Sequence, residues 1–74
     1  MKGAVSLSFA ERLKDARTRK GFKQVEFAEM IGVSQKDVSR WENGVRTPNI
    51  ESLISICNTL EVSADELLEL KNYS

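Results

Sequence analysis

Four polar side chains between residues 34 and 43 have the chemistry needed to contact the edges of nucleic-acid bases. They are Gln35, Lys36, Ser39 and Arg40. On an α-helix, residues three and four apart share a face. Glutamine can form two hydrogen bonds with adenine, and lysine or arginine can bind guanine. These residues are therefore candidates for reading bases. The plainer interpretation is a solvated polar face, which every amphipathic helix has.

A helix with defined ends is required to hold these side chains in place. Ser34 is a candidate N-cap with Asp37 three residues later, and Val38 and the valine before Ser34 occupy the positions of a hydrophobic staple. The helical period also turns Trp41 to the same side as Val38, which favours core packing of the indole over stacking on a base. The sequence therefore predicts a helix near residues 34–43 with its polar side chains outward.

A second helix is expected directly before this one. Phe27, Ala28 and Ile31 form an apolar stripe, the helix begins near residues 23–24, and Gly32 stands where a left-handed residue is wanted at its end. Two short helices joined by such a turn are the arrangement of a helix-turn-helix, whose second helix enters the major groove. The turn alone is a weak signal, because many helical bundles place a glycine between two helices.

Three further helices complete the predicted fold. Capping boxes at residues 8–11 and 63–66 begin the first and the fifth, and Asn49 caps the fourth, which is expected to be the central core helix. No strand pattern is present, so we expect an all-α, compact five-helix domain over residues 8–70, with an N-terminal extension (1–7) and a C-terminal tail (71–74). The residues expected to form one core are Leu13, Phe27, Ala28, Ile31, Val38, Trp41, Leu53, Ile54, Cys57 and Leu60.

The composition is that of one soluble domain without disulfides. The chain has 74 residues, of which 41% are hydrophobic and 30% are charged. Cys57 is the single cysteine and histidine is absent, so neither an internal disulfide nor a usual zinc site is expected, and we expect no cofactor. No apolar run is long enough for a membrane span or a signal peptide. These features favour a cytoplasmic protein.

The charge is unevenly distributed along the sequence although its net value is zero. Residues 1–46 contain ten Lys or Arg and six Asp or Glu, a balance of +4, whereas residues 47–74 contain one Lys and five Asp or Glu, a balance of −4. The basic half could meet phosphate groups, although asymmetry of this size also arises from ordinary surface charge.

The motifs together resemble the phage repressor and Cro helix-turn-helix family, often called the Xre family. The resemblance covers about residues 8–70 and implies a lambda-repressor-like fold and binding to double-stranded DNA. It rests on residues 21–28 (GFKQVEFA), 31–34 (IGVS), 38–44 (VSRWENG), 46–48 (RTP), 53–57 (LISIC) and 60–63 (LEVS).

The resemblance also implies roles for individual residues. Gln24 would bind a DNA phosphate and brace Gln35, while Lys36 and Arg40 match base-reading positions. Arg17 would pair with the glutamate of the Glu-Asn-Gly motif and lie near a phosphate. The residues implied as phosphate contacts are Arg17, Lys23, Gln24, Ser34, Asn43, Gly44 and Arg46, and the implied structural pair is Arg17 with Glu42.

Three positions depart from the family pattern. Lys23 stands where a capping Ser or Thr is usual, so it cannot cap the second helix but adds a charge that could reach phosphate. Glu61 replaces a frequent glycine after the fourth helix, so strain is expected in that turn. Cys57 stands where alanine is common, and we interpret it as a small core residue rather than a redox sensor.

We therefore expect a transcriptional repressor or controller that acts as a homodimer on a near-palindromic operator. Adjacent leucines on the fifth helix cannot both face inward, and this places a dimer interface there. The alternative is a protein-interaction module on the same fold, either an antitoxin or a partner-binding regulator. The sequence lacks the groups that an enzyme's active site would need, and no small-molecule substrate is evident. The expected dimer-interface residues are Ile56, Leu68, Leu70 and Tyr73.

Overall fold

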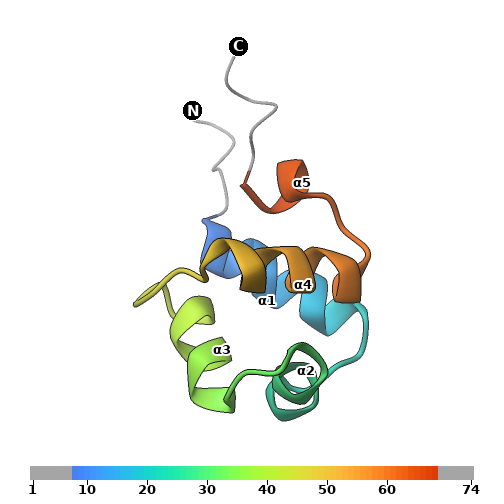
Figure 1. The fold of residues 1–74 in the computed structure, drawn as a ribbon. Coiled ribbons are helices and arrows are strands. Elements are labelled where there is room, and N and C mark those ends of the chain that lie inside the picture. Colours follow the sequence, from blue (N-terminus) through green and yellow to red (C-terminus); the bar gives the residue numbers. More distant parts are fainter. Residues whose placement is uncertain (1–7, 69–74) are drawn as a thin grey trace.

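The computed structural model describes residues 8–68, which form α-helices connected by short turns (Figure 1). Within this range there is no strand, and no helix is long and apolar enough to cross a membrane. The all-α, five-helix fold is the one that the sequence predicts. The helices are α1 (Phe9–Arg19), α2 (Gln24–Ile31), α3 (Gln35–Glu42), α4 (Ile50–Leu60) and α5 (Ala64–Leu68).

Side chains at the predicted capping positions fix where the helices begin. The Ser8 hydroxyl accepts a hydrogen bond from the Glu11 amide, and the Glu11 carboxylate accepts one from the Ser8 amide at 3.0 Å. Ser34 and Asp37 form the same reciprocal pair at the start of α3. The Asn49 side chain accepts from the backbone at the start of α4. These caps confirm the helix starts predicted at Ser8, Ser34 and Asn49. The starts were predictable because a cap involves only residues close together in the sequence.

Two helices end in a left-handed residue. Gly32 ends α2 with φ 77°, and Glu61 ends α4 with φ 57°. Glycine adopts this conformation without steric cost, whereas a residue with a Cβ is strained there. The Glu61 carboxylate forms an exposed ion pair with Lys20 at the end of α1, and this contact lowers the pKa of Glu61. The left-handed backbone conformation expected to be strained at Glu61 is thus present, and the ion pair of its carboxylate with Lys20 contributes little because it is exposed.

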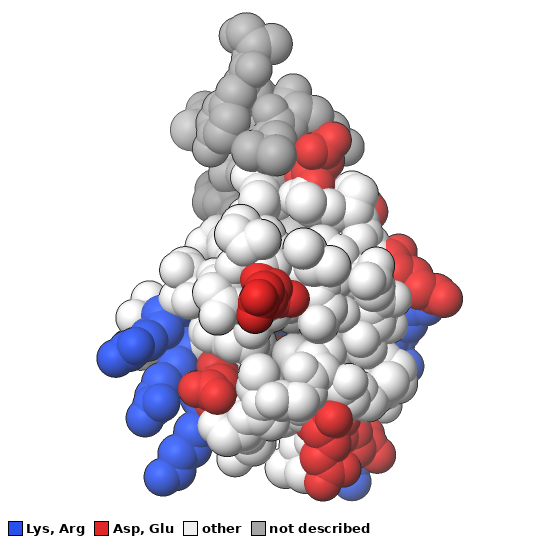
Figure 2. Space-filling model, in the orientation of Figure 1, with Lys and Arg blue, Asp and Glu red and all other residues white. Residues whose placement is uncertain are grey.

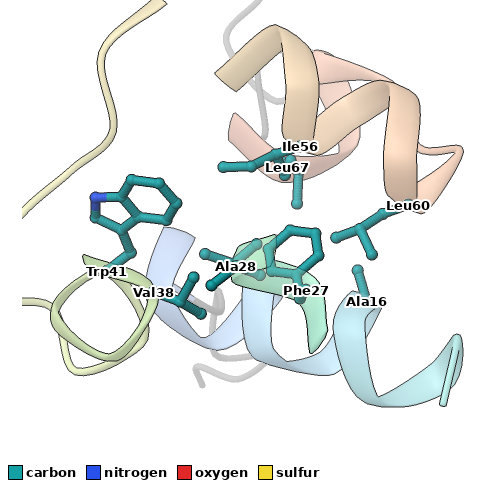
Figure 3. Close-up of a cluster of buried hydrophobic side chains, with 9 residues drawn as sticks. Ala16, Phe27, Ala28, Val38, Trp41, Ile56, Leu60 and Leu67 are labelled. Atoms are coloured by element: carbon teal, nitrogen blue, oxygen red, sulfur yellow. The ribbon is translucent and has the colours of Figure 1, made fainter. Parts of the chain in front are cut away.

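The core is centred on Phe27, which is fully buried between side chains from the other helices (Figure 3). Trp41 packs into this cluster and is only 6% exposed, so the interpretation of Trp41 as a core residue is confirmed. Half-buried apolar side chains, Cys57 among them, pack around the cluster, and desolvation raises the pKa of the Cys57 thiol. The buried cluster comprises Leu13, Ala16, Phe27, Ala28, Val38, Trp41, Ile56, Leu60 and Leu67.

The prediction for α4 was wrong at Ile54 and Ile56, whereas Leu53, Cys57 and Leu60 lie in or against the core as expected. Ile54, expected in the core, is 56% exposed, whereas Ile56, expected at a dimer interface, is fully buried. The buried side of α4 follows residues 53, 56, 57 and 60, which has the same three- and four-residue spacing as the predicted stripe. The segment from Ile50 to Cys57 is apolar on more than one face, so periodicity alone does not select the face that packs.

Candidate nucleic-acid interface

The outer face of α3 presents the predicted base-reading side chains to solvent. Gln35, Lys36 and Arg40 are exposed, and Ser39 is half-buried beside them. Figure 2 shows Lys and Arg side chains projecting together from the edge of the molecule where α3 lies in Figure 1. On the opposite side of the helix, Val38 is buried in the core. The outer face of α3 is therefore polar and cationic, and the burial of Val38 on the opposite side of the helix fixes its orientation.

Arg40 remains accessible although an acidic residue lies one turn before it. The Arg40 Nη1 is 3.8 Å from the Asp37 carboxylate, and both side chains are about half exposed. An exposed ion pair of this length contributes little and is screened by salt. The guanidinium is consequently free to exchange this contact for a stronger bidentate one with a guanine edge.

A hydrogen bond from α2 braces the first residue of α3. The Gln35 side-chain Nε2 donates to the side-chain Oε1 of Gln24 at 2.8 Å, and the Gln24 side-chain Nε2 donates in turn to Glu42 Oε1 at 3.0 Å. These contacts tie Gln35 to Gln24 at the start of α2 and to Glu42 at the end of its own helix. The side chain of Gln35 is thus ordered in advance of any contact with a ligand, which lowers the entropy lost on binding.

A buried ion pair connects this brace to α1. The Arg17 Nε and Nη2 donate to the two carboxylate oxygens of Glu42 at 2.6 and 2.9 Å, and Arg17 Nη1 donates to the Phe22 carbonyl oxygen at 2.6 Å. The two side chains are 9% and 2% exposed. Each guanidinium nitrogen is engaged inside the protein, which leaves little surface for the phosphate contact implied for Arg17. Its structural role is to hold α3 against α1.

The other residues implied as phosphate contacts lie around the two ends of the helix pair. Gln24 is half-buried at the start of α2, and Asn43 donates from its side-chain amide to the Ser39 hydroxyl at 3.3 Å. Gly44 has φ 77°, which turns the chain out of α3. The exposed members of the set are Lys23, Ser34, Asn43, Gly44 and Arg46. Together they flank the base-reading face at both ends.

Of the predicted dimer-interface residues, the structure describes Ile56 and Leu68. Ile56 is fully buried, so its assignment to an interface was wrong, because the face of α4 that carries it packs on the core. Leu68 is half-buried and lines a small hollow next to Leu53, while the neighbouring Leu67 is buried. Leu70 and Tyr73 lie outside the described residues.

One contact of the site has no signature in the sequence. The Phe22 carbonyl oxygen is the third acceptor of the Arg17 guanidinium, and a backbone acceptor is available at almost every residue. Only the turn between α1 and α2, which contains Gly21 at φ 82°, directs this carbonyl toward Arg17.

No group of three or more residues suited to hold a metal ion occurs in the described part of the chain.

Comparison with known proteins identifies related sequences and structures. A family model described as Helix-turn-helix matches residues 13–67. The HTH-type transcriptional activator BcrR of Enterococcus faecalis is 42% identical over 62 residues, which cover 84% of this chain and 30% of that protein. The chain spans between 30 and 56% of the length of this relative and two other curated regulators.

Solved structures of similar fold include two complexes with DNA. The P22 c2 repressor bound to a synthetic operator has a TM-score of 0.83 at 31% identity, covering 86% of this chain and 97% of the other. The biofilm regulator SinR in complex with DNA has a TM-score of 0.75 at 33% identity, covering 80% and 95% of the two chains.

Proposed function

The chain belongs to the helix-turn-helix family, and from that membership we propose that it is a sequence-specific regulator of transcription that binds double-stranded DNA in the cytoplasm. The observation that carries the proposal is the braced face of α3. Gln35 is fixed by Gln24, and the cationic Lys36 and Arg40 are exposed on the same helix. The related P22 c2 repressor is named as bound to a synthetic operator, and SinR as bound to DNA.

In this proposal α3 enters the major groove with its N-terminal half toward the bases. Gln35 reads an adenine edge, Lys36 and Arg40 read guanine, and Ser39 adds a hydroxyl that can donate or accept a hydrogen bond at a base edge. Phosphate contacts on both sides set the depth and register of the helix. The residues proposed for these contacts are Lys23, Gln24, Ser34, Asn43, Gly44 and Arg46, with residues 8–70 forming the binding domain.

One recognition helix reads too few base pairs to select one site in a genome. We therefore propose that two copies bind a near-palindromic operator whose half-sites are centred about 10–10.5 base pairs apart, or a multiple of that spacing. Occupation of the operator represses or controls the adjacent promoter. A protein-interaction module on the same fold has no need of an exposed glutamine, lysine and arginine together on α3, so the DNA-binding function is favoured over it.

The proposal is tested by selecting bound duplexes from a random pool and repeating the selection with Arg40→Ala. The wild type should yield an inverted repeat. The variant should lose about 1–3 kcal/mol of discrimination at one position of each half-site and keep its preferences elsewhere. Arg19→Ala is the matched control, because Arg19 carries the same charge, is exposed on α1 and pairs with Asp15. Uniform loss over all sequences would make Arg40 a phosphate contact, and enrichment of no sequence would contradict the function.

A further inference from the structure

The outer side of α2 carries a shallow hollow formed by none of the residues proposed to contact DNA. It has a volume of about 550 Å³ and is bounded by the turn before α2 and by one side of that helix. The residues on the helix are three or four positions apart and therefore share a face. We use the name α2 hollow for the surface lined by Gly21, Phe22, Glu26, Glu29 and Met30.

The α2 hollow combines accessible apolar groups with carboxylates. Met30 is 53% exposed, Phe22 is half-buried, and the two glutamates are exposed. Val25, one helical turn before Glu29, is 52% exposed and extends the apolar surface. No lysine or arginine lines the hollow. Exposed apolar surface bordered by charged groups is typical of an interaction site, and methionine is frequent where a surface must adapt to a partner.

The charge of Glu29 has no role within the fold. Glu26 is explained by capping, because its carboxylate accepts a hydrogen bond from the Lys23 amide at 2.8 Å. Glu29 lies in the last turn of α2, where a negative charge opposes the helix dipole and where no basic residue compensates it. Within residues 8–68 the Glu29 carboxylate has no ion-pair partner. The carboxylate is therefore available to a cation from outside the chain.

We propose that the α2 hollow binds a basic segment of another protein that also carries aliphatic side chains. A lysine or arginine of that segment lays its aliphatic stem against Phe22 and Met30 and brings its charge to Glu26 and Glu29. The proposal goes beyond the proposed function and does not depend on it.

The chemistry of the α2 hollow favours this occupant over three others. Its carboxylates repel the phosphates of nucleic acids. Four of its five lining residues are exposed, whereas a site for a small molecule encloses most of its ligand. A second copy of this chain could offer the cations of α3, Lys36 and Arg40, but these are the residues proposed to read DNA, so such a contact would be lost on the operator.

The position of the α2 hollow allows a partner and DNA to bind together. Gln24, at the start of α2, holds Gln35 of the base-reading face, whereas the hollow extends to Glu29 and Met30 in the last turn. Figure 2 shows acidic side chains on the part of the surface where α2 lies in Figure 1, away from the cations that project beside α3. In the proposed complex the hollow remains accessible beside the duplex.

The test uses three synthetic helical peptides as probes, titrated into the protein and followed by amide NMR. One contains lysine and leucine, the second has glutamate in place of lysine, and the third has serine in place of leucine. The lysine–leucine peptide should shift the signals of residues 21–30. The glutamate peptide should not bind, and the serine peptide should bind at least about fivefold more weakly, since burial of each leucine contributes to affinity. Shifts spread equally over the acidic residues of α4 and α5, or equal binding by the serine peptide, would overturn the proposal.

Two matched variants locate the binding charge. Glu29→Lys should weaken binding of the lysine–leucine peptide about tenfold, because an attraction becomes a repulsion. Glu51→Lys, at an exposed glutamate of α4, should leave the affinity unchanged. Unfolding does not explain the expected loss, because a cation in the last turn of α2 is favourable and the melting temperature of Glu29→Lys should not fall. Equal affinities of the two variants would overturn the proposal, as would concentration-dependent shifts at residues 21–30 without peptide, which would assign the hollow to a second copy.

Discussion

Glu42 links α1, α2 and α3 behind the proposed interface. Its carboxylate accepts hydrogen bonds from Arg17 on α1 and from Gln24 on α2, and Gln24 holds Gln35. A single buried side chain therefore orients a base-reading residue seven positions away. The pairing of Arg17 with Glu42 was implied by the sequence motifs, whereas the additional bond from Glu42 to Gln24 follows only from the packed structure.

Removing one member of this pair should be more damaging than removing both. Arg17→Met leaves the Glu42 carboxylate buried without its main partner and is expected to destabilise the fold by about 3–5 kcal/mol. Arg17→Met combined with Glu42→Leu replaces both charges by apolar groups and should recover most of that loss. Urea denaturation of the two variants measures the difference.

Measuring DNA binding by the same two variants separates the effect of the Arg17–Glu42 pair on folding stability from its effect on the position of Gln35. The double variant deprives Gln24 of its acceptor, so it should fold but discriminate less at the base contacted by Gln35. A double variant as unstable as Arg17→Met would show that side-chain packing, and not the buried charge, accounts for the loss.

At the scale of helices, local signals determined the beginnings and long-range packing determined the orientations. The caps at Ser8, Ser34 and Asn49 were predictable because donor and acceptor lie within three residues of one another. The rotation of α4 was not, because Ile50, Ile54 and Ile56 offer apolar side chains on competing faces. The packing of α4 against α2 favours the face that carries Ile56, which lies in the same buried cluster as Phe27.

Exchanging the residue at each left-handed helix end should change stability in opposite directions at Gly32 and Glu61. Gly32→Ala should destabilise the protein by about 1–2 kcal/mol, since no atom lies within 4 Å of the added Cβ and the cost is that of the backbone conformation alone. Glu61→Gly should raise the melting temperature, because it relieves the same strain and gives up only an exposed ion pair with Lys20. Thermal unfolding measures both effects. A lower melting temperature for Glu61→Gly would mean that the ion pair outweighs the strain.

For the molecule as a whole, replacing isoleucine by alanine on α4 should cost far more stability at the buried Ile56 than at the exposed Ile54. Ile56→Ala creates a cavity in a fully buried site and should cost about 2–5 kcal/mol, a large fraction of the stability of a small domain. Ile54→Ala removes the same atoms from an exposed site and should change stability by less than about 0.5 kcal/mol. Calorimetry of both variants checks the register of α4. Equal losses would contradict it.

The separation of charge over the molecule predicts how binding depends on salt. Affinity for DNA should fall steeply as salt rises, and Lys23→Gln should reduce the log–log slope by about 0.9 if Lys23 meets a phosphate. Lys20→Gln is the control, because Lys20 is engaged with Glu61 where α1 meets the end of α4. Titrations at several salt concentrations measure the slopes. Equal slopes for wild type and Lys23→Gln would remove Lys23 from the interface.

The hydrogen bond between Gln24 and Gln35 has a consequence for how such a regulator acquires a new target. Lys36 and Arg40 are exposed and do not belong to the core cluster, so mutation can exchange them one at a time with little loss of stability. Position 35 is different, because a new side chain there must also suit Gln24 on the neighbouring helix. Among related proteins, residues 24 and 35 should therefore co-vary, whereas residues 36 and 40 should vary independently. A library built to retarget the protein should randomise the first two jointly.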